Sequence, residues 1–453
     1  MKRKTLIISL SIAVLIICAM AAVMTGCNAK GDEYADLVAI RINNHMAEWV
    51  DSSYNFDYKG VGELNVTVPY TNYLEINDLI VSPKATAMVY EDEACTQELK
   101  EKDYYIYIDI NKTLYVKVIN NKKSNIYKVN VTVKQTNLPD NVDLSVKDYD
   151  NRGGHVYIPD SVKQVSIDGE DYYVLDRLEW YDCENISNAA SQRYILSSDS
   201  RCSHFWKFGS DIFNGIFDGN GYMLYVERSI NEKGATNLTT IKEIGENGVF
   251  RNFTLAATST FNYNSDTYAG YEVWNNKIAV LCNENYGTID NVCNSISLMD
   301  STTRFAGDTE EEYVHRLAIY ADVNRGVISN CLNKGSIVGE ESDIKIRQFS
   351  IFANEMHGEQ YDYTGSAKLI NCVNTGNIEY NTTASNDYHN SGVYLIATNA
   401  DAYVQLNEVY NVGRIQKSNN KKKYGRYFLN ASSVNANGKS RDVDCSRIKD
   451  YTK

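Results

Sequence analysis

Three aspartates in the C-terminal half are the residues whose type best suits acid–base chemistry: Asp211, Asp218 and Asp290. Paired carboxylates on one face of a fold hydrolyse glycosidic bonds, one as an acid and the other as a base or nucleophile. Asp218, however, lies in the turn 217–221, Phe-Asp-Gly-Asn-Gly, where an aspartate serves the backbone. No nucleophile with an adjacent base accompanies any of the three. We therefore predict no catalytic residue.

The six histidines do not have the pattern of a metal site, because they are neither spaced as zinc ligands nor repeated with a period. The segment 148–153 is similar to a calcium loop, but Arg152 and Pro159 stand where oxygen ligands are required. The sequence also contains no phosphate loop, dinucleotide fingerprint or serine-hydrolase elbow. We expect no metal ion and no cofactor.

Tyrosine is frequent, at 35 residues, and gathers in two insertions. The candidate ligand-binding residues are Tyr263, Tyr268, Tyr271, Trp274, Tyr286, Tyr361 and Tyr363. A Tyr ring offers a large amphipathic contact area at low entropy cost, which suits recognition of a glycan or a protein. The alternative is that these rings fill strand faces in a Tyr-rich chain.

A repeat must position these side chains. Segments such as 326–337, Gly-Val-Ile-Ser-Asn-Cys-Leu-Asn-Lys-Gly-Ser-Ile, recur along the C-terminal half. Their equivalent apolar residues are Phe250, Ile289, Ile328, Leu369 and Leu406. The steps between these positions are 39, 39, 41 and 37 residues, which predicts a stacked array rather than a single globular core. Whether one period forms one coil with a loop or two short coils is left open.

A second apolar ladder is expected at Phe253, Val292, Cys331, Cys372 and Val409. Its odd spacing from the first ladder predicts a bend between them, because strand alternation alone would point the two to opposite faces. Four asparagines sit at that bend, where Asn tolerates a left-handed backbone and can hydrogen-bond along the stack: Asn252, Asn291, Asn330 and Asn371. Glycines at the next corner are expected to adopt positive φ: Gly335, Gly376 and Gly413. The shared repeat position of Cys331 and Cys372 favours stacked buried thiols.

The open end of such a stack needs a cap. Residues 176–188 are predicted to form a short capping helix, since Asp176 and Glu179 have capping-box spacing. Cys183 on that helix and Cys202 in the first coil are a candidate disulfide that would staple the cap, although export permits many pairings of the eight cysteines that follow Cys27.

The run 213–222, Phe-Asn-Gly-Ile-Phe-Asp-Gly-Asn-Gly-Tyr, together with the later repeats, resembles the GLUG-type bacterial β-helix domain. The resemblance spans roughly residues 160–416. It implies a right-handed parallel β-helix, which we assign to residues 157–450.

Residues 37–135 show alternating apolar segments separated by polar turns, which predicts about six strands and a β-sandwich. The segments 89–96, 114–118 and 127–131 resemble the bacterial cadherin-like repeat, an Ig-like spacer or adhesive module without catalytic residues. Residues 136–156 are expected to be a linker. The predicted fold class is thus all-β, a sandwich followed by a parallel β-helix solenoid.

The first residues form a secretion signal, with a basic start at Lys2 to Lys4 and an apolar run from Leu6 to Val23. The ending Thr-Gly-Cys27 resembles the bacterial lipoprotein signal. That resemblance implies that residues 1–26 are removed, that Cys27 carries the lipid, and that residues 27–36 form a tether. A transmembrane anchor is the alternative, because the apolar run is near the lower length limit of a span.

The net charge of −13 argues against a nucleic-acid partner, since phosphate binding needs concentrated Lys and Arg. We expect a lipid-anchored, surface-exposed, extracytoplasmic bacterial protein in which a sandwich stalk carries a β-helix head. Its expected role is non-catalytic adhesion to, or binding of, an extracellular glycan or protein. The alternatives are a β-helix polysaccharide lyase or hydrolase and a structural envelope protein.

Overall fold

The computed structural model describes residues 34–50, 62–69, 73–100, 105–107, 111–134, 158, 161–176, 185–202, 210–227, 239–273, 277–300, 314–339, 346–358, 367–380, 392–400, 403–417, 426–430, 432–434, 440–442 and 446–452. Within these ranges the chain is all-β, as predicted, with a 3-10 turn at Ala189–Ser191 and no α-helix. None of the described segments is a helix long and apolar enough to cross a membrane. Most of the expected capping helix and all of the expected linker lie outside the described residues.

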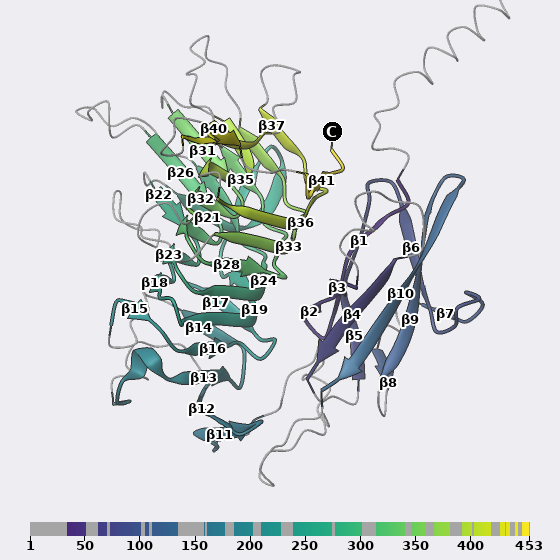
Figure 1. Cartoon of the computed structure of the whole chain (residues 1–453), viewed down its shortest axis with the longest axis horizontal. Coiled ribbons are helices and arrows are strands. Elements are labelled where there is room, and N and C mark those ends of the chain that lie inside the picture. The colour runs from purple at the N-terminus through teal and green to yellow at the C-terminus, as the bar shows by residue number, and fades with distance from the viewer. Residues whose placement is uncertain are drawn as a thin grey trace, which may run out of the picture.

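The N-terminal unit is two sheets packed around one core (Figure 1). The four-stranded sheet contains β1 (Leu37–Ile42), β2 (His45–Met46), β5 (Tyr73–Val81) and β8 (Tyr105–Tyr107). The six-stranded sheet contains β3 (Glu48–Trp49), β4 (Glu63–Val68), β6 (Thr86–Tyr90), β7 (Glu98–Leu99), β9 (Lys112–Asn120) and β10 (Lys123–Val133). Alternate residues of β4, β9 and β10 point into the core, which explains the alternating sequence. We call this unit the sandwich.

The C-terminal unit is a stack of coils built from three largely parallel sheets. The docking sheet, named for its contact with the sandwich, contains β11 (Gln164–Ile167), β12 (Glu170–Leu175), β13 (Arg193–Leu196), β14 (Ser200–Cys202), β16 (Ile216–Asp218), β17 (Met223–Val226), β19 (Val249–Ala257), β24 (Thr288–Asn294), β28 (Val327–Ser329), β29 (Leu332–Asn333), β33 (Lys368–Asn374), β36 (Gln405–Asn411) and β41 (Ile448–Asp450). Only β11 runs antiparallel, against β12.

The back sheet contains β15 (Ile212–Phe213), β18 (Ile241–Ile244), β22 (Lys277–Ala279), β23 (Cys282–Asn285), β26 (Val314–Ala318), β27 (Ala321–Asn324), β31 (Ile346–Ser350), β32 (Ala353–Met356), β35 (Gly392–Ala400) and β38 (Arg426–Asn430). The side sheet contains β20 (Thr260–Tyr263), β21 (Asp266–Val273), β25 (Ser297–Asp300), β30 (Ile337–Gly339), β34 (Ile378–Tyr380) and β37 (Ile415–Lys417). A separate hairpin joins β39 (Ser432–Val434) to β40 (Ser440–Asp442).

The predicted ladder is confirmed rung by rung. Phe250 pairs with Ile289, Ile289 with Ile328, Ile328 with Leu369, and Leu369 with Leu406. Each of these strands belongs to the docking sheet, and the chain visits the side and back sheets before it returns. One period of about 39 residues is therefore one coil, which answers the question that the sequence leaves open. The parallel, solenoid-like architecture follows directly from this register.

The asparagine corners are confirmed in both conformation and bonding. The φ angles of Asn252, Asn291, Asn330 and Asn371 are 60°, 51°, 53° and 50°. Asn291 Nδ2 donates to Asn252 Oδ1 at 3.1 Å, and Asn371 Nδ2 donates to Asn330 Oδ1 at 2.9 Å. Because the left-handed residue Asn252 interrupts the alternation of side chains within β19, Phe250 and Phe253 both point into the core despite their odd spacing.

The prediction of positive φ at Gly335, Gly376 and Gly413 is wrong. Among described glycines only Gly169 and Gly221 have positive φ. A Cβ added at Gly335 would lie 1.9 Å from the carbonyl oxygen of Ile296, and one at Gly376 would lie 1.9 Å from that of Gly335. These glycines are needed because neighbouring coils approach too closely there for any side chain.

A second asparagine ladder runs through the interior of the coils. Asn294 Nδ2 donates to Asn333 Oδ1, Asn333 to Asn374 and Asn374 to Asn411, each at 2.8 Å, and all four side chains are fully buried. The side-chain amides of Asn294, Asn333 and Asn374 each also donate to the backbone carbonyl two residues further along the chain. Because every polar group in this row has a partner, its burial stabilises one register of the stack.

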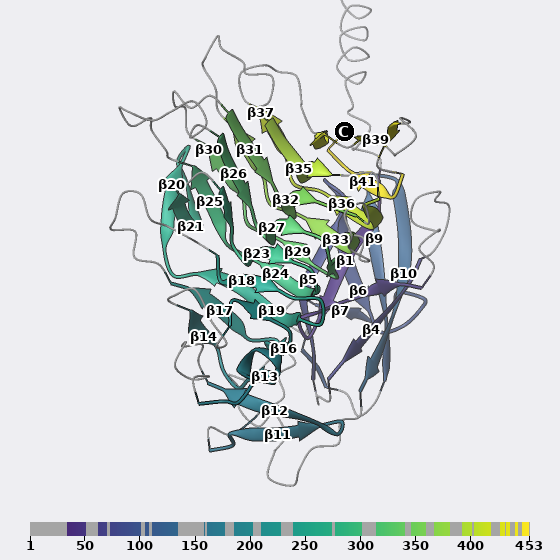
Figure 2. The same ribbon diagram turned by 60° about the vertical axis from the view of Figure 1, so that its left-hand side comes forward.

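The sandwich lies beside the coils and does not extend them (Figures 1 and 2), so the expected stalk-and-head arrangement is wrong. Strand β1 runs along the stack. Asp36 precedes it and bonds to Lys449 of β41, whereas Asn44 follows it and bonds to Gly221 between β16 and β17. Six strand-to-strand steps of about 4.8 Å separate β16 from β41, so the contacts made by Asp36 and Asn44 lie about 29 Å apart along the stack.

Candidate binding site between the two units

The seam between the sandwich and the docking sheet begins with an apolar contact. Val38, Ala39 and Met46 of the sandwich pack on a row formed by four docking-sheet residues and the residue that follows β41: Cys293, Leu332, Val373, Tyr410 and Tyr451. All of these side chains are buried. The docking sheet is therefore apolar on both of its faces over this row, since its other face lines the core of the coils. Burial of this surface stabilises the pairing of the two units.

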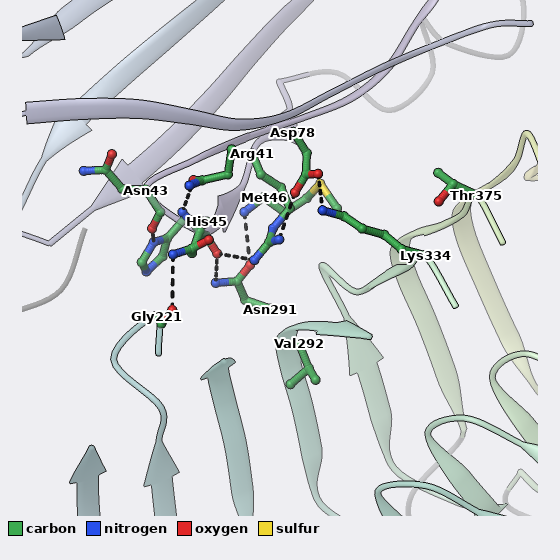
Figure 3. A network of polar contacts seen from close by, with 12 residues as sticks. Arg41, Asn43, His45, Met46, Asp78, Gly221, Asn291, Val292, Lys334 and Thr375 are labelled. Carbon is green, nitrogen blue, oxygen red and sulfur yellow. Dashed lines mark hydrogen bonds and ion pairs between the residues drawn. The ribbon is translucent and has the colours of Figure 1, made fainter. Parts of the chain in front are cut away.

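Corner asparagines add specific polar contacts (Figure 3). Asn291 Oδ1 accepts from the Met46 amide at 3.1 Å, and Asn291 Nδ2 donates to the Asn44 carbonyl at 2.8 Å. Asn371 Nδ2 donates in the same way to the Ala47 carbonyl at 3.0 Å. The side chains that bond along the corner row thus also bond to the sandwich. The direction of the amides fixes the register between the two units.

An ion-pair group lies in the same seam (Figure 3). Arg41 Nη1 donates to Asp78 Oδ2 at 3.0 Å, and Lys334 of the coils also pairs with Asp78. Arg41 is 2% exposed. Asp78 thus binds one cation from each unit. Because a buried cation without a partner is costly, this ion-pair group favours the one orientation of the two units in which both cations reach Asp78.

A cavity of about 370 Å³ lies between the units at the end of the stack where the coils begin. Its sandwich wall is formed by His45, Thr67, Val68, Pro69 and Lys134. Its coil wall is formed by Ile167, Asp168, Glu170, Tyr172, Ile195, Asp218, Asn220, Arg251, Asn252 and Asp290. A concave, mixed polar and apolar space at a junction of two units is the usual setting of a small-ligand site.

Asp218 lies at the centre of the coil wall and is held on every side. Its carboxylate accepts from the Asn220 amide at 2.9 Å, from Arg251 Nε at 2.8 Å and from Asn252 Nδ2 at 3.1 Å. Arg251 Nη2 in turn donates to the Tyr172 hydroxyl at 3.3 Å. The backbone role that the turn predicts for Asp218 is confirmed. These donors make the Asp218 carboxylate a structural link between the turn and the coil wall.

His45 supplies the sandwich side of the cavity. Its Nδ1 lies 2.6 Å from the Asn43 carbonyl, which only accepts, so Nδ1 carries the hydrogen and Nε2 is left as an acceptor. Burial lowers the pKa of His45 below its ordinary value. Neutral imidazole is therefore the prevailing form at neutral pH. Asn43 and Asn44 have φ angles of 48° and 60° and form the tight turn that presents His45.

The residues that line the cavity have a net negative charge. Its charged residues are Lys134 and Arg251 against Asp168, Glu170, Asp218 and Asp290, which gives a net charge of −2 with His45 neutral. Ion pairs at its rim fix two of the carboxylates: Lys134 pairs with Asp168, and Arg193 Nη2 lies 2.7 Å from Glu170 Oε2. Because the acceptors are held in place, the cavity favours a neutral or cationic ligand rich in hydrogen-bond donors.

The tyrosines predicted to bind a ligand are only partly accessible. Tyr263 is 6% exposed and Tyr271 is 1% exposed, with the Tyr271 hydroxyl donating to the Val226 carbonyl. Tyr268 stacks on Phe261 with ring centres 5.3 Å apart and is half-buried. Tyr286 is half-buried and donates to Glu284 at 2.7 Å. Trp274, Tyr361 and Tyr363 lie outside the described residues.

The other predicted sites fall largely outside the described chain. Cys27 and Cys183 are among the residues that the structure does not describe, so the lipid site and the disulfide stay predictions; Cys202 is buried. Cys331 and Cys372 are buried free thiols one coil apart, as expected. Burial, followed by the hydrogen bond to Cys372, raises the pKa of Cys331, so this thiol is inert at neutral pH.

Two neighbouring carboxylates lie on the outer surface of the back sheet, away from the cavity. Glu243 of β18 and Glu284 of β23 are register partners. Burial, and then the charge of Glu284, raises the pKa of Glu243. Glu284 also accepts from Tyr286 and lies 3.5 Å from Arg325 Nη1. Glu243 and Glu284 form a pair of neighbouring carboxylates, which the sequence does not reveal. The two residues become neighbours only through the register between successive coils.

The described residues contain no group of three or more His, Cys, Asp or Glu side chains placed to hold a metal ion. Comparison with protein-family models, with curated proteins and with solved structures gave no match to this chain. The cavity and the carboxylate pair are the two structural features that bear on function.

Proposed function

We propose that this chain is a lipid-anchored, extracytoplasmic bacterial protein that binds an extracellular ligand, a glycan or a protein segment, without catalysis. The observation that carries the proposal is the cavity of about 370 Å³ between the sandwich and the coils. The signal that ends at Cys27 supports the anchor. In this proposal the N-terminal unit is a cadherin-like domain and the coils are a GLUG-type β-helix.

The lining favours a saccharide chain end over other ligands. Fixed carboxylate and imidazole acceptors suit hydroxyl donors, and Tyr172 and Ile195 offer an apolar wall for the carbon face of a sugar ring. Arg251 supplies a donor. The net charge of −2 disfavours uronic acids and phosphates, which separates this proposal from a lyase for acidic polysaccharides.

The proposal is tested by titrating the chain from residue 27 on, carrying Cys27→Ser, with neutral and acidic oligosaccharides in a calorimeter. Thr67→Trp narrows the cavity without removing a contact within it and should abolish binding. Thr132→Trp is the matched control, since Thr132 is the register partner of Thr67, equally exposed, and does not line the cavity. Saturable binding that Thr67→Trp leaves unchanged would place the ligand elsewhere.

A second candidate function, cleavage of a polysaccharide, is favoured by the pair Glu243 and Glu284. A carboxyl group with a raised pKa beside a second carboxyl group is the arrangement of a glycosidase acid and its partner. Release of new sugar ends that both Glu243→Gln and Glu284→Gln abolish, and that Glu227→Gln preserves, would establish it. No turnover and no saturable binding would favour the third candidate, a structural envelope protein.

A further inference from the structure

Asp290 differs from the other carboxylates that line the cavity between the two units. Each of the other three has a cationic partner: Asp218 with Arg251, Asp168 with Lys134, and Glu170 with Arg193. Arg251 is the register partner of Asp290 on β19, but its nitrogens bond to Asp218 and Tyr172. Among the described residues no Lys or Arg lies within ion-pair distance of Asp290. The cavity therefore holds one carboxylate whose charge no neighbouring side chain pairs.

Two neutral donors fix the Asp290 carboxylate without cancelling its charge. Ser329 Oγ donates to Asp290 Oδ1 at 2.6 Å, and Asn330 Nδ2 donates to the same oxygen at 3.0 Å. Because both bonds go to Oδ1, Oδ2 makes no hydrogen bond within the part of the chain that the structure describes. The carboxylate is already oriented, so a ligand that binds Oδ2 does not have to order this side chain first.

His45 offers a second acceptor from the sandwich wall of the same cavity. Its Nδ1 donates to the Asn43 carbonyl, and its Nε2 is left to accept. The charges of Asp218 and Asp290 both act on the imidazole ring, so the ring of one unit lies within electrostatic reach of the carboxylates of the other. An ammonium group carries three donors and no acceptor, whereas a hydroxyl group carries one donor. An ammonium group can therefore donate to both Asp290 and His45, but a hydroxyl group can donate to only one of them.

We propose that the cavity binds a saccharide that carries a primary ammonium group, an amino sugar, and that Asp290 determines this selectivity. The inference rests on the proposed function and narrows its class of ligand. A carboxylate with no cation beside it gains more from a cationic donor than from a hydroxyl, because charge-assisted hydrogen bonds are stronger than neutral ones. The apolar wall formed by Ile195 and Tyr172 suits the carbon face of the sugar ring. A lysine side chain offers the same cation but loses more rotamer freedom on binding.

The class of ligand is tested by titrating the chain from residue 27 on, carrying Cys27→Ser, with a matched series of β-linked trisaccharides at about pH 7. The trisaccharides of glucosamine, glucose and glucuronic acid present an ammonium, a hydroxyl and a carboxylate group on the same kind of ring. We expect the glucosamine trisaccharide to bind at least about tenfold more tightly than the glucose trisaccharide, and the glucuronic acid trisaccharide to bind most weakly. Equal affinities, or tighter binding of the glucose trisaccharide, overturn the inference.

The role of Asp290 is tested with Asp290→Asn, which removes the charge and keeps an oxygen for Ser329 and Asn330. The ratio of affinities for the glucosamine and glucose trisaccharides should fall to within about twofold of one. Asp171→Asn is the matched control and should keep the parent ratio, because Asp171 is exposed near the same end of the stack and does not line the cavity. Equal falls in both variants contradict a direct contact with Asp290. Thermal unfolding checks that the variants are folded, and the ligand series on the parent decides the class of ligand without them.

The amino-sugar inference and the proposed function fail in different ways. If the three trisaccharides bind equally and Thr67→Trp abolishes their binding, the cavity stands as the binding site and the amino sugar is wrong. If none of them binds, the saccharide site itself is wrong. Tighter binding of a lysine-containing peptide than of the glucosamine trisaccharide would assign the cavity to a protein segment and overturn the amino sugar.

Discussion

The Met46 amide donates to Asn291 Oδ1 at 3.1 Å across 245 residues of sequence. This contact joins the sandwich to a coil corner that the sequence marks only as a bend. The same side chain also bonds to Asn44 and Asn252, so one residue serves the turn, the stack and the seam between the units.

Asn291→Ala should lower the free energy of unfolding by about 2–4 kcal/mol. The reason is that it removes three hydrogen bonds and places alanine at a φ of 51°. Asn291→Gly is the control, because it loses the same bonds without the strain and should cost about 1–2 kcal/mol less. Denaturant titration measures both. Equal costs for the two variants would show that the backbone conformation is unimportant here.

Gly335→Ala should prevent the coils from stacking, because the new Cβ would lie 1.9 Å from the backbone oxygen of Ile296. We expect a loss of more than about 3 kcal/mol or failure to fold. Gly169→Ala is the comparison: Gly169 has a φ of 83° but nothing within 4 Å, so its cost is limited to about 1–2 kcal/mol of strain. Thermal unfolding distinguishes them, and a larger loss at Gly169 would contradict the close-approach argument.

Asp218→Asn should lower the unfolding free energy by about 1–2 kcal/mol, a reduced figure because Arg251 is 35% exposed and solvent screens the pair. The variant keeps an acceptor for the Asn220 amide but loses the charge. A double-mutant cycle with Arg251→Gln measures the coupling between the two residues. If the losses in unfolding free energy of the two single variants add up in the double variant, the ion pair between Asp218 and Arg251 contributes nothing to stability.

Stability should fall on mild acidification because of His45. Its folded pKa is lowered by burial, so the unfolded chain, with an ordinary value of about 6.5, takes up the proton first. The stabilisation is complete above about pH 6.5 and declines as the pH falls toward the folded pKa, by at most about 1.4 kcal/mol per pH unit. After burial, the groups that affect the pKa of His45 are Asn43, through its backbone hydrogen bond, and the charges of Asp218, Arg41 and Asp290.

His45→Gln removes the titrating group and should flatten this decline between pH 7 and pH 5.5. Carboxylates titrate mainly below that range, so the difference between parent and variant isolates the histidine. Parallel curves for the two proteins would show that His45 does not control the pH dependence.

The coils were predictable from the sequence because each rung repeats the same residue types at one period. Ile289 and Ile328 are equivalent in sequence and become partners in space. The corner conformation was also predictable, since Asn is favoured where φ is positive. The role of Gly335, Gly376 and Gly413 was not predictable. The sequence does not distinguish a glycine required by positive φ from one required by a close neighbouring carbonyl oxygen.

The candidate site was not predictable, because its residues come from two units whose docking depends on shape. His45 and Asp218 are far apart in sequence, and neither belongs to a motif that requires the other. The tyrosines illustrate a related difficulty: Tyr271 and Tyr268 are close in sequence, yet the ring of one is buried and the other is half-buried. Residue type alone does not separate packing from exposure in a Tyr-rich chain.

The contact between Asp36 and Lys449 spans 413 residues. Synthesis proceeds from the N-terminus, so the sandwich emerges long before the surface on which it rests. Its apolar flank at Val38 and Met46 stays uncovered until the coils that bury it have been made and folded. Such a chain is most prone to misassociation before its last coil forms, and a premature stop before β41 would leave Asp36 without its bond to Lys449.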